Sequence, residues 1–394
     1  MSNRFAALTG NQAAALAMRQ IEPDVCAAYP ITPSTQVMET YSQYVADGAV
    51  RTELVLVESE HSAMSACVGA ACAGARAMTA TSSQGLALMH EVLYIAAGLR
   101  LPIVMAVANR ALSAPLNIHG DQSDTMGSRD AGWIQLYVRD VQELYDTLIQ
   151  APRIAEHCEV MLPVMVCFDG FTLSHAIERV ELLEDGAVRD FVGVYRPERY
   201  LLDVEHPHTF GPALLPDYYT EAKRQQREAM SRALEIIPHV ALEFGARFGR
   251  AWGMVEAYRL EDAEIAAVVL GSTAGTLMEV VDRMRERGVR AGMLRLRAFR
   301  PFPAEEVVRL LAPLKAVAIF DRADSPGTPS GPLYEEIRSV LYDAPARPRI
   351  SGMVYGLGGR EMLVEEASAT YEALERAAAG TAEIPPPGYL SARG

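Results

Sequence analysis

The sequence predicts an α/β protein of two doubly wound domains, each with a parallel sheet covered by helices. From the start to about residue 170, short apolar runs of strand length alternate with helix-like segments. The alternation stops in a stretch rich in proline and aromatic residues and resumes at residue 263. We therefore expect a first domain over 1–250, with an irregular arm at about 171–250, and a smaller second domain over 251–394.

Nearly continuous apolar runs in the first domain predict strands that are covered on both faces. The expected strands are 25–29, 54–57, 77–81, 102–107 and 164–168, and the expected helices are 12–19, 37–45, 62–75, 86–99 and 141–158. The helix at 62–75 consists almost entirely of small residues, which let a neighbouring backbone or a flat ligand come close.

Over 171–218 we expect no regular structure, since long loops of this kind are uncommon unless they are functional or pack on a partner. A polar helix at 220–236 follows. The second domain is expected to contain strands at 265–270, 291–296, 316–320 and 350–354, and helices at 277–286, 305–311 and 333–341. The proline-rich tail at 384–388 is expected to be disordered or to pack in an extended conformation.

Composition excludes several classes of protein. The formal net charge of -14 argues against nonspecific binding to nucleic acid, which depends on a basic surface. No apolar run approaches the roughly 20 residues that span a bilayer, and the N-terminal residues lack the layout of a secretory signal. We therefore expect a soluble, cytoplasmic protein that binds neither nucleic acid nor membrane.

The five cysteines occur in apolar or small-residue surroundings, and none forms a CxxC pair. Buried thiols are typical of a reducing compartment, and iron–sulfur ligation needs closely spaced thiolates. The eight histidines include no HxxxH or HExxH pattern, so a zinc site is not expected. We assign no metal ligand on this chain.

An acidic pair, Glu58 and Glu60, follows the strand at 54–57 where the next helix begins. Open α/β sheets bind their ligands at such strand ends, and a carboxylate in an apolar crevice needs a partner. The alternative is an acid that only stabilises the positive end of the helix dipole. The residues alone do not choose between Glu58 and Glu60.

Two further strand ends carry polar residues. Thr32 lies between Pro30 and Pro33, which stiffen its loop and leave its hydroxyl able to bond a carboxylate. Arg110 follows the strand at 102–107 and offers a planar fork suited to a carboxylate. An ordinary proline-rich turn and a surface ion pair are the respective alternatives. The polar loop 117–124 could line the same crevice or cap the next element.

The residues Thr32, Glu60, Ser83, Gln84 and Arg110 all lie in loops after predicted strands. In a parallel sheet those loops share one edge, so convergence there is stronger evidence for a site than any single residue. The sequence contains no GxGxxG fingerprint opening a helix and no Walker loop.

An ordered series of segments along nearly the whole chain resembles the α subunits of 2-oxoacid:ferredoxin oxidoreductases, most closely the pyruvate type. The segments that carry the resemblance are Tyr29-Pro-Ile-Thr-Pro-Ser34, Glu58-Ser-Glu60, Thr81-Ser-Ser-Gln-Gly85, Asn109-Arg-Ala-Leu-Ser-Ala-Pro115, Gly120-Asp-Gln-Ser-Asp124, Arg300-Pro-Phe-Pro303, Asp321-Arg322 and Tyr355-Gly-Leu-Gly-Gly359.

The resemblance implies a thiamine diphosphate enzyme whose first domain holds the aminopyrimidine end of the cofactor and whose second domain is similar to the transketolase C-terminal fold. It implies that Glu60 is the catalytic acid at the pyrimidine ring nitrogen and that Thr32 and Arg110 bind the substrate carboxylate. The residues that it implies for the rest of the cofactor site are Pro30, Ser83 and Gln84. The implied reaction is the reversible oxidative decarboxylation of pyruvate to acetyl-CoA and CO2, with reduction of ferredoxin.

The resemblance also implies partner chains, because this sequence lacks cluster cysteines and the motif that holds magnesium and a diphosphate. A β subunit is expected to hold the diphosphate and Mg. Gamma and ferredoxin-like delta subunits, or fused equivalents, are expected to carry the 4Fe–4S clusters. Ferredoxin, pyruvate and coenzyme A complete the expected partners, and the chain alone is expected to be inactive.

Several alternatives stay open. Branched-chain 2-oxoacids, 2-oxoglutarate or oxalate could replace pyruvate, although Thr32 matches the pyruvate pattern and an arginine there would indicate oxalate. A transketolase-like thiamine enzyme would carry the diphosphate motif on the same chain, and a nicotinamide dehydrogenase would need a glycine fingerprint. A non-catalytic scaffold subunit is the last alternative, against which the presence of Thr32, Glu60 and Arg110 argues.

Overall fold

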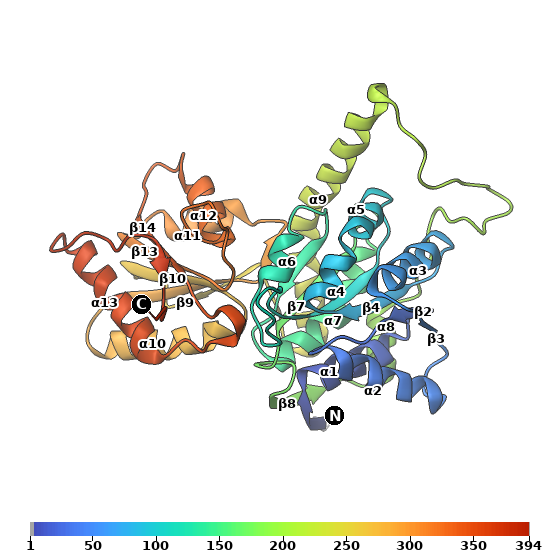
Figure 1. The fold of residues 1–394 in the computed structure, drawn as a ribbon, viewed down its shortest axis with the longest axis horizontal. Helices are drawn as coiled ribbons and strands as arrows, with labels where there is room; N and C mark the ends of the chain where they lie inside the picture. The colour runs from blue at the N-terminus through green and yellow to red at the C-terminus, as the bar shows by residue number, and fades with distance from the viewer. Residues whose placement is uncertain (1–3, 394) are drawn as a thin grey trace.

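The computed structural model describes residues 4–393, which form two lobes that each contain one large sheet (Figure 1). The first sheet has seven strands in the order β12-β6-β7-β5-β4-β2-β3, and the second has six in the order β15-β14-β13-β10-β11-β9. Neighbouring strands are parallel except in the edge pairs β12–β6 and β11–β9. The predicted class, an α/β protein with two mostly parallel sheets, is confirmed.

The strands of the first sheet match the buried apolar runs of the sequence. Their bounds are β2 (Val25–Ala28), β3 (Glu53–Leu56), β4 (Ala77–Thr81), β5 (Val104–Asn109), β6 (Ile134–Tyr137), β7 (Val164–Asp169) and β12 (Ala298–Arg300). On one face lie α1 (Gly10–Ile21), α2 (Thr35–Ala46) and α7 (Val141–Ala155), and on the other lie α3 (Glu60–Cys72), α4 (Ser83–Leu88) and α5 (His90–Gly98). Successive side chains of β2 alternate between these two apolar clusters, as Cys26 and Ala27 do.

The second lobe repeats this plan on a smaller scale. Its strands are β9 (Val255–Tyr258), β10 (Ile265–Leu270), β11 (Ala291–Leu296), β13 (Ala316–Asp321), β14 (Arg349–Val354) and β15 (Gly388–Tyr389). Its helices are α10 (Ala274–Glu286), α11 (Ala304–Leu311), α12 (Pro332–Leu341) and α13 (Val364–Ala378), with short 3-10 turns η1 (Gly271–Thr273) and η2 (Leu357–Gly359). The tail packs in an extended conformation, because Ser351 donates to the carbonyl of Pro385 and β15 pairs with β14.

The segment expected to be irregular over 171–218 contains regular structure, which corrects that expectation. Strand β8 (Ile177–Leu182) pairs antiparallel with β1 (Arg4–Thr9), and α8 (Asp185–Val192) follows. Residues 193–215 then form an extended excursion before α9 (Pro216–Phe248). This helix is longer than the predicted 220–236 and projects from the first lobe with its N-terminal half (Figure 1). No helix within 4–393 is long and apolar enough to cross a membrane.

One strand ties the lobes together across the predicted domain division. Strand β12 follows β11 in the chain, yet it leaves the second sheet and pairs with β6 at the edge of the first. Phe299, which belongs to β12, packs edge to face with Tyr137 at 6.4 Å and with Phe302 at 6.1 Å between ring centroids. One apolar cluster therefore continues from the first sheet into the second.

A buried group of charges lies beside this crossover. The carboxylate of Glu143, on α7, lies 3.1 Å from Nη1 of Arg295 and 3.0 Å from Nε of Arg297. Arg295 also pairs with Glu256 at 2.7 Å, and Arg297 donates to the hydroxyl of Thr147 at 2.8 Å. Burial lowers the pKa of Arg297 to about 10. Two buried guanidinium groups thus share the carboxylate of Glu143.

We expect Glu143→Gln to lower the free energy of unfolding by about 3–5 kcal/mol, because removing one partner leaves buried charge uncompensated. Urea-induced unfolding followed by circular dichroism measures this change. The matched control is Glu279→Gln, which breaks an exposed pair with Arg283 and should change the stability by less than about 1 kcal/mol. Equal effects of the two substitutions would contradict the assignment.

Candidate active site

The loops after β2, β3, β4 and β5 gather at one edge of the first sheet, because these four strands are parallel. The loop after β3 leads to Glu60, the loop after β4 to Ser83, and the loop after β5 to Arg110. The loop after β2 contains Pro30 and Thr32. The predicted convergence of these loops is therefore what the topology produces.

Glu60 is the first residue of α3, and its side chain is buried against the start of α4. It is 7% exposed, whereas Glu58 is exposed at the surface. The hydroxyl of Ser59 caps the helix by accepting the amide of Ser62 at 3.2 Å, so the cap does not use Glu60. Within 4–393, no hydrogen bond or ion pair involves the Glu60 carboxylate. Burial therefore distinguishes Glu60 from Glu58, which the sequence left open.

Gly85 allows this close approach between α4 and Glu60. A Cβ at this position would lie 2.7 Å from Oε1 of Glu60 and 2.5 Å from Oγ1 of Thr81. The Thr81 hydroxyl is itself buried and has no hydrogen-bond partner among the described residues. Two polar oxygens without protein partners thus flank Gly85, which is the arrangement expected where a polar ligand completes the bonding.

Arg110 is held by backbone carbonyl groups. It is 7% exposed, and its guanidinium donates from Nη1 to the carbonyl of Thr32 at 2.8 Å and from Nε to the carbonyl of Asn117 at 3.1 Å. No ion pair formed by the described residues involves this guanidinium. Its position is therefore set by neutral acceptors, and its charge stays uncompensated.

The structure brings Thr32, Ser83 and Arg110 into one network. The Ser83 hydroxyl lies 2.6 Å from the carbonyl oxygen of Ala111 and 2.6 Å from Oε1 of Gln84. Ser83 has a φ of 45°, in the left-handed region that costs free energy for a residue with a side chain. The Thr32 side chain is exposed, and its contact with Arg110 is made by the backbone. Pro30 is also exposed on this loop.

Asp124, in α6 (Ser123–Gly127), was not singled out from the sequence, although the polar loop 117–124 was noted. Its carboxylate accepts the amides of Ser83 at 2.9 Å and Arg110 at 3.0 Å, and the side-chain amide of Asn109 at 2.8 Å. Burial raises the pKa of Asp124 to about 6, although these donors act in the opposite direction. The available signal was a second acid in a polar loop close after Arg110.

The second lobe contacts the loop that carries Asn117 and Asp121. Asn117 donates its side-chain amide to the carbonyl of Gly358 at 2.9 Å, and the amide of Gly358 donates to Asp121 at 3.0 Å. The amide of Gln122 donates to the carbonyl of Arg322 at 2.8 Å. Asn117 supplies one of the two carbonyl groups that orient Arg110, and its side chain is held by the second lobe.

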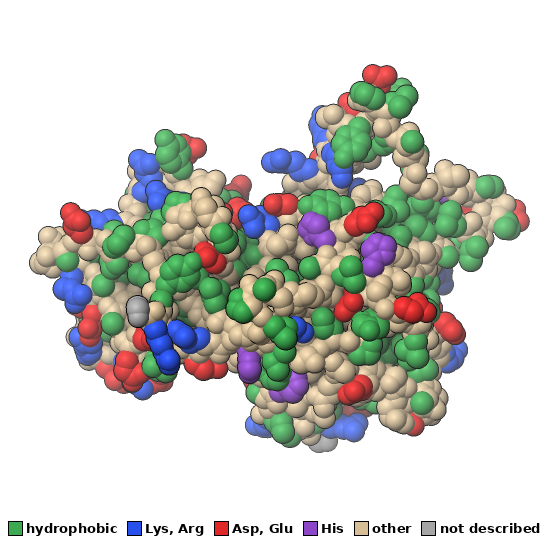
Figure 2. Space-filling view, viewed as in Figure 1, with side chains coloured by type: hydrophobic (Ala, Val, Ile, Leu, Met, Phe, Trp, Pro, Cys, Tyr) green, Lys and Arg blue, Asp and Glu red, His purple; other side chains and the backbone are tan. Residues whose placement is uncertain are grey.

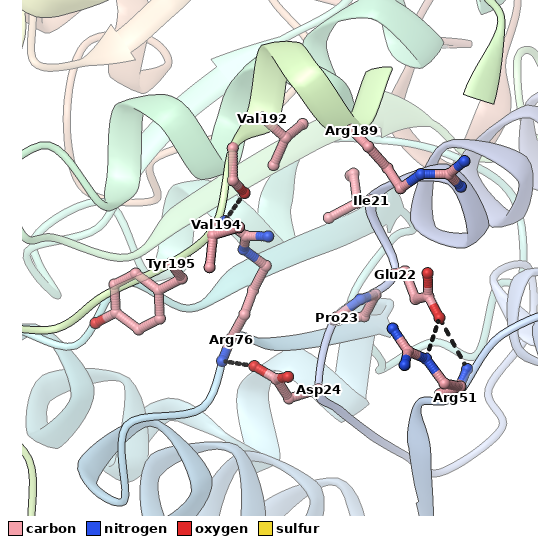
Figure 3. A pocket seen from close by; sticks show the side chains of 11 residues that line it. Ile21, Glu22, Pro23, Asp24, Arg51, Arg76, Arg189, Val192, Val194 and Tyr195 are labelled. Carbon is pink, nitrogen blue, oxygen red and sulfur yellow. Dashed lines mark hydrogen bonds and ion pairs between the residues drawn. The ribbon is translucent and has the colours of Figure 1, made fainter. Parts of the chain in front are cut away.

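A cavity of about 510 Å³ lies at the opposite edge of the sheet (Figure 3). It is lined by Asp24 and Arg76, each directly before a strand, and by Arg51 and Arg189. Arg76 donates its amide to Asp24 at 2.8 Å and its guanidinium to Glu156 at 2.6 Å. This cavity is therefore separate from the residues gathered at the carboxyl ends of the strands.

Among the described residues, the Glu60 carboxylate and the Arg110 guanidinium lack a partner of opposite charge, and both lie at the carboxyl edge of a parallel sheet, which is where α/β proteins bind their ligands. Comparison with known proteins identifies the family. Residues 16–241 match the family described as "Pyruvate flavodoxin/ferredoxin oxidoreductase, thiamine diP-bdg", and residues 263–367 match "Pyruvate:ferredoxin oxidoreductase core domain II".

Two relatives and one solved structure define the similarity further. The chain is 57% identical over 366 residues to pyruvate synthase subunit PorA of Thermotoga maritima, covering 93% of each chain. It is 40% identical over 370 residues to ketoisovalerate oxidoreductase subunit VorA of Pyrococcus horikoshii, covering 94% of this chain and 93% of that one. The 2-oxoglutarate:ferredoxin oxidoreductase of Magnetococcus marinus has the same fold, with a TM-score of 0.74 at 20% sequence identity. The match covers 94% of this chain and 65% of that longer chain.

The chain belongs to the pyruvate:ferredoxin oxidoreductase family, as an α subunit, and its first lobe is a thiamine diphosphate-binding domain. The resemblance predicted from the sequence motifs is thereby confirmed. The residues at the edge suit an aminopyrimidine ring, because the Glu60 carboxylate and the Thr81 hydroxyl have no hydrogen-bond partner among residues 4–393 and Gly85 leaves room beside them. Among residues 4–393, no group of three or more His, Cys, Asp and Glu side chains is arranged to hold a metal ion.

We expect Gly85→Ala to weaken thiamine diphosphate binding, because the new methyl group would displace Glu60 or Thr81. Overpacking of a close contact costs about 1–3 kcal/mol, so the dissociation constant should rise about 5–150-fold. Titration of the cofactor-depleted complex with thiamine diphosphate measures it. Gly98→Ala is the control, since a Cβ there meets nothing within 4 Å. Unchanged binding in the Gly85 variant would show that the site tolerates the methyl group.

Proposed function

We propose that this α subunit provides the pyrimidine half of the active site in an enzyme that oxidatively decarboxylates pyruvate to acetyl-CoA and CO2 and reduces ferredoxin, reversibly. The observation that carries the proposal is the buried Glu60 carboxylate, which has no hydrogen-bond or ion-pair partner in the described part of the chain and lies in a domain that matches the thiamine diphosphate-binding family. The substrate assignment is supported by the 57% identity to a pyruvate synthase subunit.

Glu60 would bond the pyrimidine ring nitrogen and exchange a proton with it, which is general acid–base work. Bound thiamine diphosphate would supply the carbon nucleophile and the electron sink for decarboxylation. The burial of Glu60 suits this role, because a hydrogen bond between a carboxyl group and a ring nitrogen is stronger in a site that excludes water. The chain at Ser83, Gln84 and Pro30 would form the surrounding wall of the cofactor site.

Arg110 would bind the substrate carboxylate together with Thr32. Its Nε and Nη1 groups already donate to two carbonyl oxygens, which fixes the plane of the guanidinium before substrate arrives. Because no carboxylate of the described residues pairs with Arg110, its charge remains available to an anion. The Thr32 side chain lies exposed on the adjoining loop and would add a hydroxyl donor.

Partner chains would complete the enzyme. We propose a β subunit for the diphosphate and Mg, and gamma and ferredoxin-like delta subunits, or fused equivalents, for the 4Fe–4S clusters. The relatives' description as subunits supports this. So does the projecting arm formed by residues 193–215 and the N-terminal half of α9, along which Figure 2 shows exposed hydrophobic side chains. On the arm, Val204 is 84% and Leu215 70% exposed, as is typical of surfaces that bind protein.

The buried free thiols Cys26, Cys67 and Cys167 suit a cytoplasmic location.

The test is an assay of the native complex for ferredoxin or viologen reduction with coenzyme A and a panel of 2-oxoacids. The proposal expects pyruvate to give the highest kcat/KM. A higher value with 3-methyl-2-oxobutanoate would favour the branched-chain alternative, for which the 40% identical ketoisovalerate relative is the motivating observation. Absence of activity with every 2-oxoacid would favour a scaffold role and overturn the proposal.

Glu60→Gln should abolish pyruvate-dependent ferredoxin reduction while the complex still assembles. The amide cannot exchange a proton with the ring nitrogen, and loss of general acid–base catalysis costs typically about 10²–10⁴-fold in rate. The measurement is kcat of the purified complex, with subunit content checked by gel filtration. Glu58→Gln, at the exposed neighbour, serves as the control and should retain normal turnover. Normal activity of the Glu60 variant would remove this residue from the mechanism.

Arg110→Ala should mainly raise KM for pyruvate. A hydrogen-bonded contact to a charged group is worth about 1.5–3 kcal/mol, which corresponds to about a 10–150-fold increase. Steady-state kinetics of the complex separate this effect from a change in kcat. KM for coenzyme A is the internal control and should stay near its normal value. If KM for pyruvate is unchanged, Arg110 does not bind the substrate carboxylate.

A further inference from the structure

We propose that Asp124 is a positioning residue that locks the loops after β4 and β5 together and thereby presents Arg110 to the substrate. The inference rests on the proposed function, in which Arg110 binds the substrate carboxylate. Asp124 does not itself reach the exposed part of the site, since it is 3% exposed beneath these loops. Its effect on the reaction would therefore pass through the residues that it bonds.

Both oxygens of Asp124 are used as acceptors. Oδ2 accepts the amide of Ser83 at 2.9 Å and the amide of Arg110 at 3.0 Å, so one atom joins two loops that are distant in the sequence. Oδ1 accepts the side-chain amide of Asn109 at 2.8 Å and the amide of Thr125 at 2.7 Å. The carboxylate is thus bonded to the end of β5, to the residue after it, and to the start of α4.

A carboxylate suits this position better than an amide. All four partners are N–H donors, and an ionised carboxylate only accepts. An asparagine would turn its own NH2 group toward two of these donors, so two buried amides would lose their acceptor. Of the two loops, the one that contains Ser83 is the more sensitive to loss of this acceptor, because surrounding contacts have to maintain the Ser83 φ of 45°.

The network continues beneath Asp124, which keeps the carboxylate from shifting to compensate. The Thr125 hydroxyl accepts from the side-chain amide of Asn109 at 2.8 Å and from the hydroxyl of Tyr137 at 2.8 Å. The side-chain amide of Gln135 donates to the carbonyl of Thr125 at 2.9 Å. Because these groups are buried and bonded to one another, a change at Asp124 moves the loops above it rather than the strands below.

The experiment compares native complexes that contain Asp124→Asn, Arg110→Ala or both substitutions. We expect Asp124→Asn to raise KM for pyruvate by at least about tenfold, as when a buried charged acceptor is lost, with a smaller change in kcat. In the Arg110→Ala background the same substitution should add little further, because its effect passes through Arg110. A purely structural role would not produce this dependence on Arg110.

Asp146→Asn is the matched control, because Asp146 is also buried and, on α7, accepts N–H groups of Arg250 and Trp252 rather than of the loops at the site. It should lower the thermal midpoint as Asp124→Asn does, yet leave KM for pyruvate within about twofold, as expected for a distant site. If Asp124→Asn prevents assembly, Asn109→Ala replaces it. That variant removes the Asn109 donor and keeps both backbone amides, and it should raise KM less but with the same dependence on Arg110.

The outcomes separate the two proposals. A wild-type complex that does not oxidise pyruvate would overturn the proposed function itself. An active wild-type complex in which Arg110→Ala raises KM, but Asp124→Asn leaves it unchanged or multiplies it independently of Arg110, would overturn only the positioning role of Asp124. For Asn109→Ala, an unchanged KM would count in the same way.

Discussion

The common direction of the strands in the first sheet is the constraint on which the active site depends. Parallel pairing places the loops after β2, β3, β4 and β5 at one edge, whatever the distance between them in the sequence. Thr32 and Arg110 are 78 positions apart, yet the guanidinium of one donates to the carbonyl of the other. The residues of the site therefore need no strong local conformational preference to come together, because the parallel sheet places their loops at the same edge.

Three of the buried carboxylates, those of Glu143, Asp124 and Glu60, have different surroundings, and the contrast suggests their roles. Glu143 is surrounded by guanidinium groups and joins the lobes. Asp124 accepts four N–H donors and joins two loops. Glu60 has neither kind of partner within the described chain, and a buried carboxylate is costly in that state. A protein retains such a group where a ligand completes its bonding, and this contrast is why we propose the catalytic role for Glu60 rather than for the other two.

The sequence predicted the elements that local patterns determine. Continuous apolar runs identify β2, β4, β5 and β7 because both faces of those strands are covered. Strand β6 was missed, since its four residues include a buried Gln135 that is satisfied by a distant carbonyl group rather than by a local pattern. The helix predicted over 220–236 is longer in the structure, where α9 continues through Pro238 and buries residues such as Val240 and Phe244.

In the candidate site, too, local sequence patterns identify some residues, whereas others depend on tertiary contacts. Glu60, Ser83 and Arg110 could be named because each follows a recognisable strand. The residue patterns alone could not choose between Glu60 and Glu58, and only the family resemblance favoured Glu60, because the choice depends on where α3 begins and on the room that Gly85 leaves beside it. Asp124 could not be assigned at all, since its role lies in amide groups that sequence patterns do not describe.

Contacts between the second lobe and the loop that contains Asn117 give the second lobe a supporting role that its own sequence does not indicate. The carbonyl of Asn117 orients the Arg110 guanidinium, and the side chain of Asn117 donates to Gly358 of the second lobe. Asp169 at the end of β7 lies 3.3 Å from Arg322, so a buried ion pair joins the lobes directly behind the same loop. Because a guanidinium aims its donors rigidly, a small shift in its supporting carbonyl would misdirect them. The second lobe therefore supports the arginine that we propose to bind the substrate, and a continuous apolar cluster joins the two lobes.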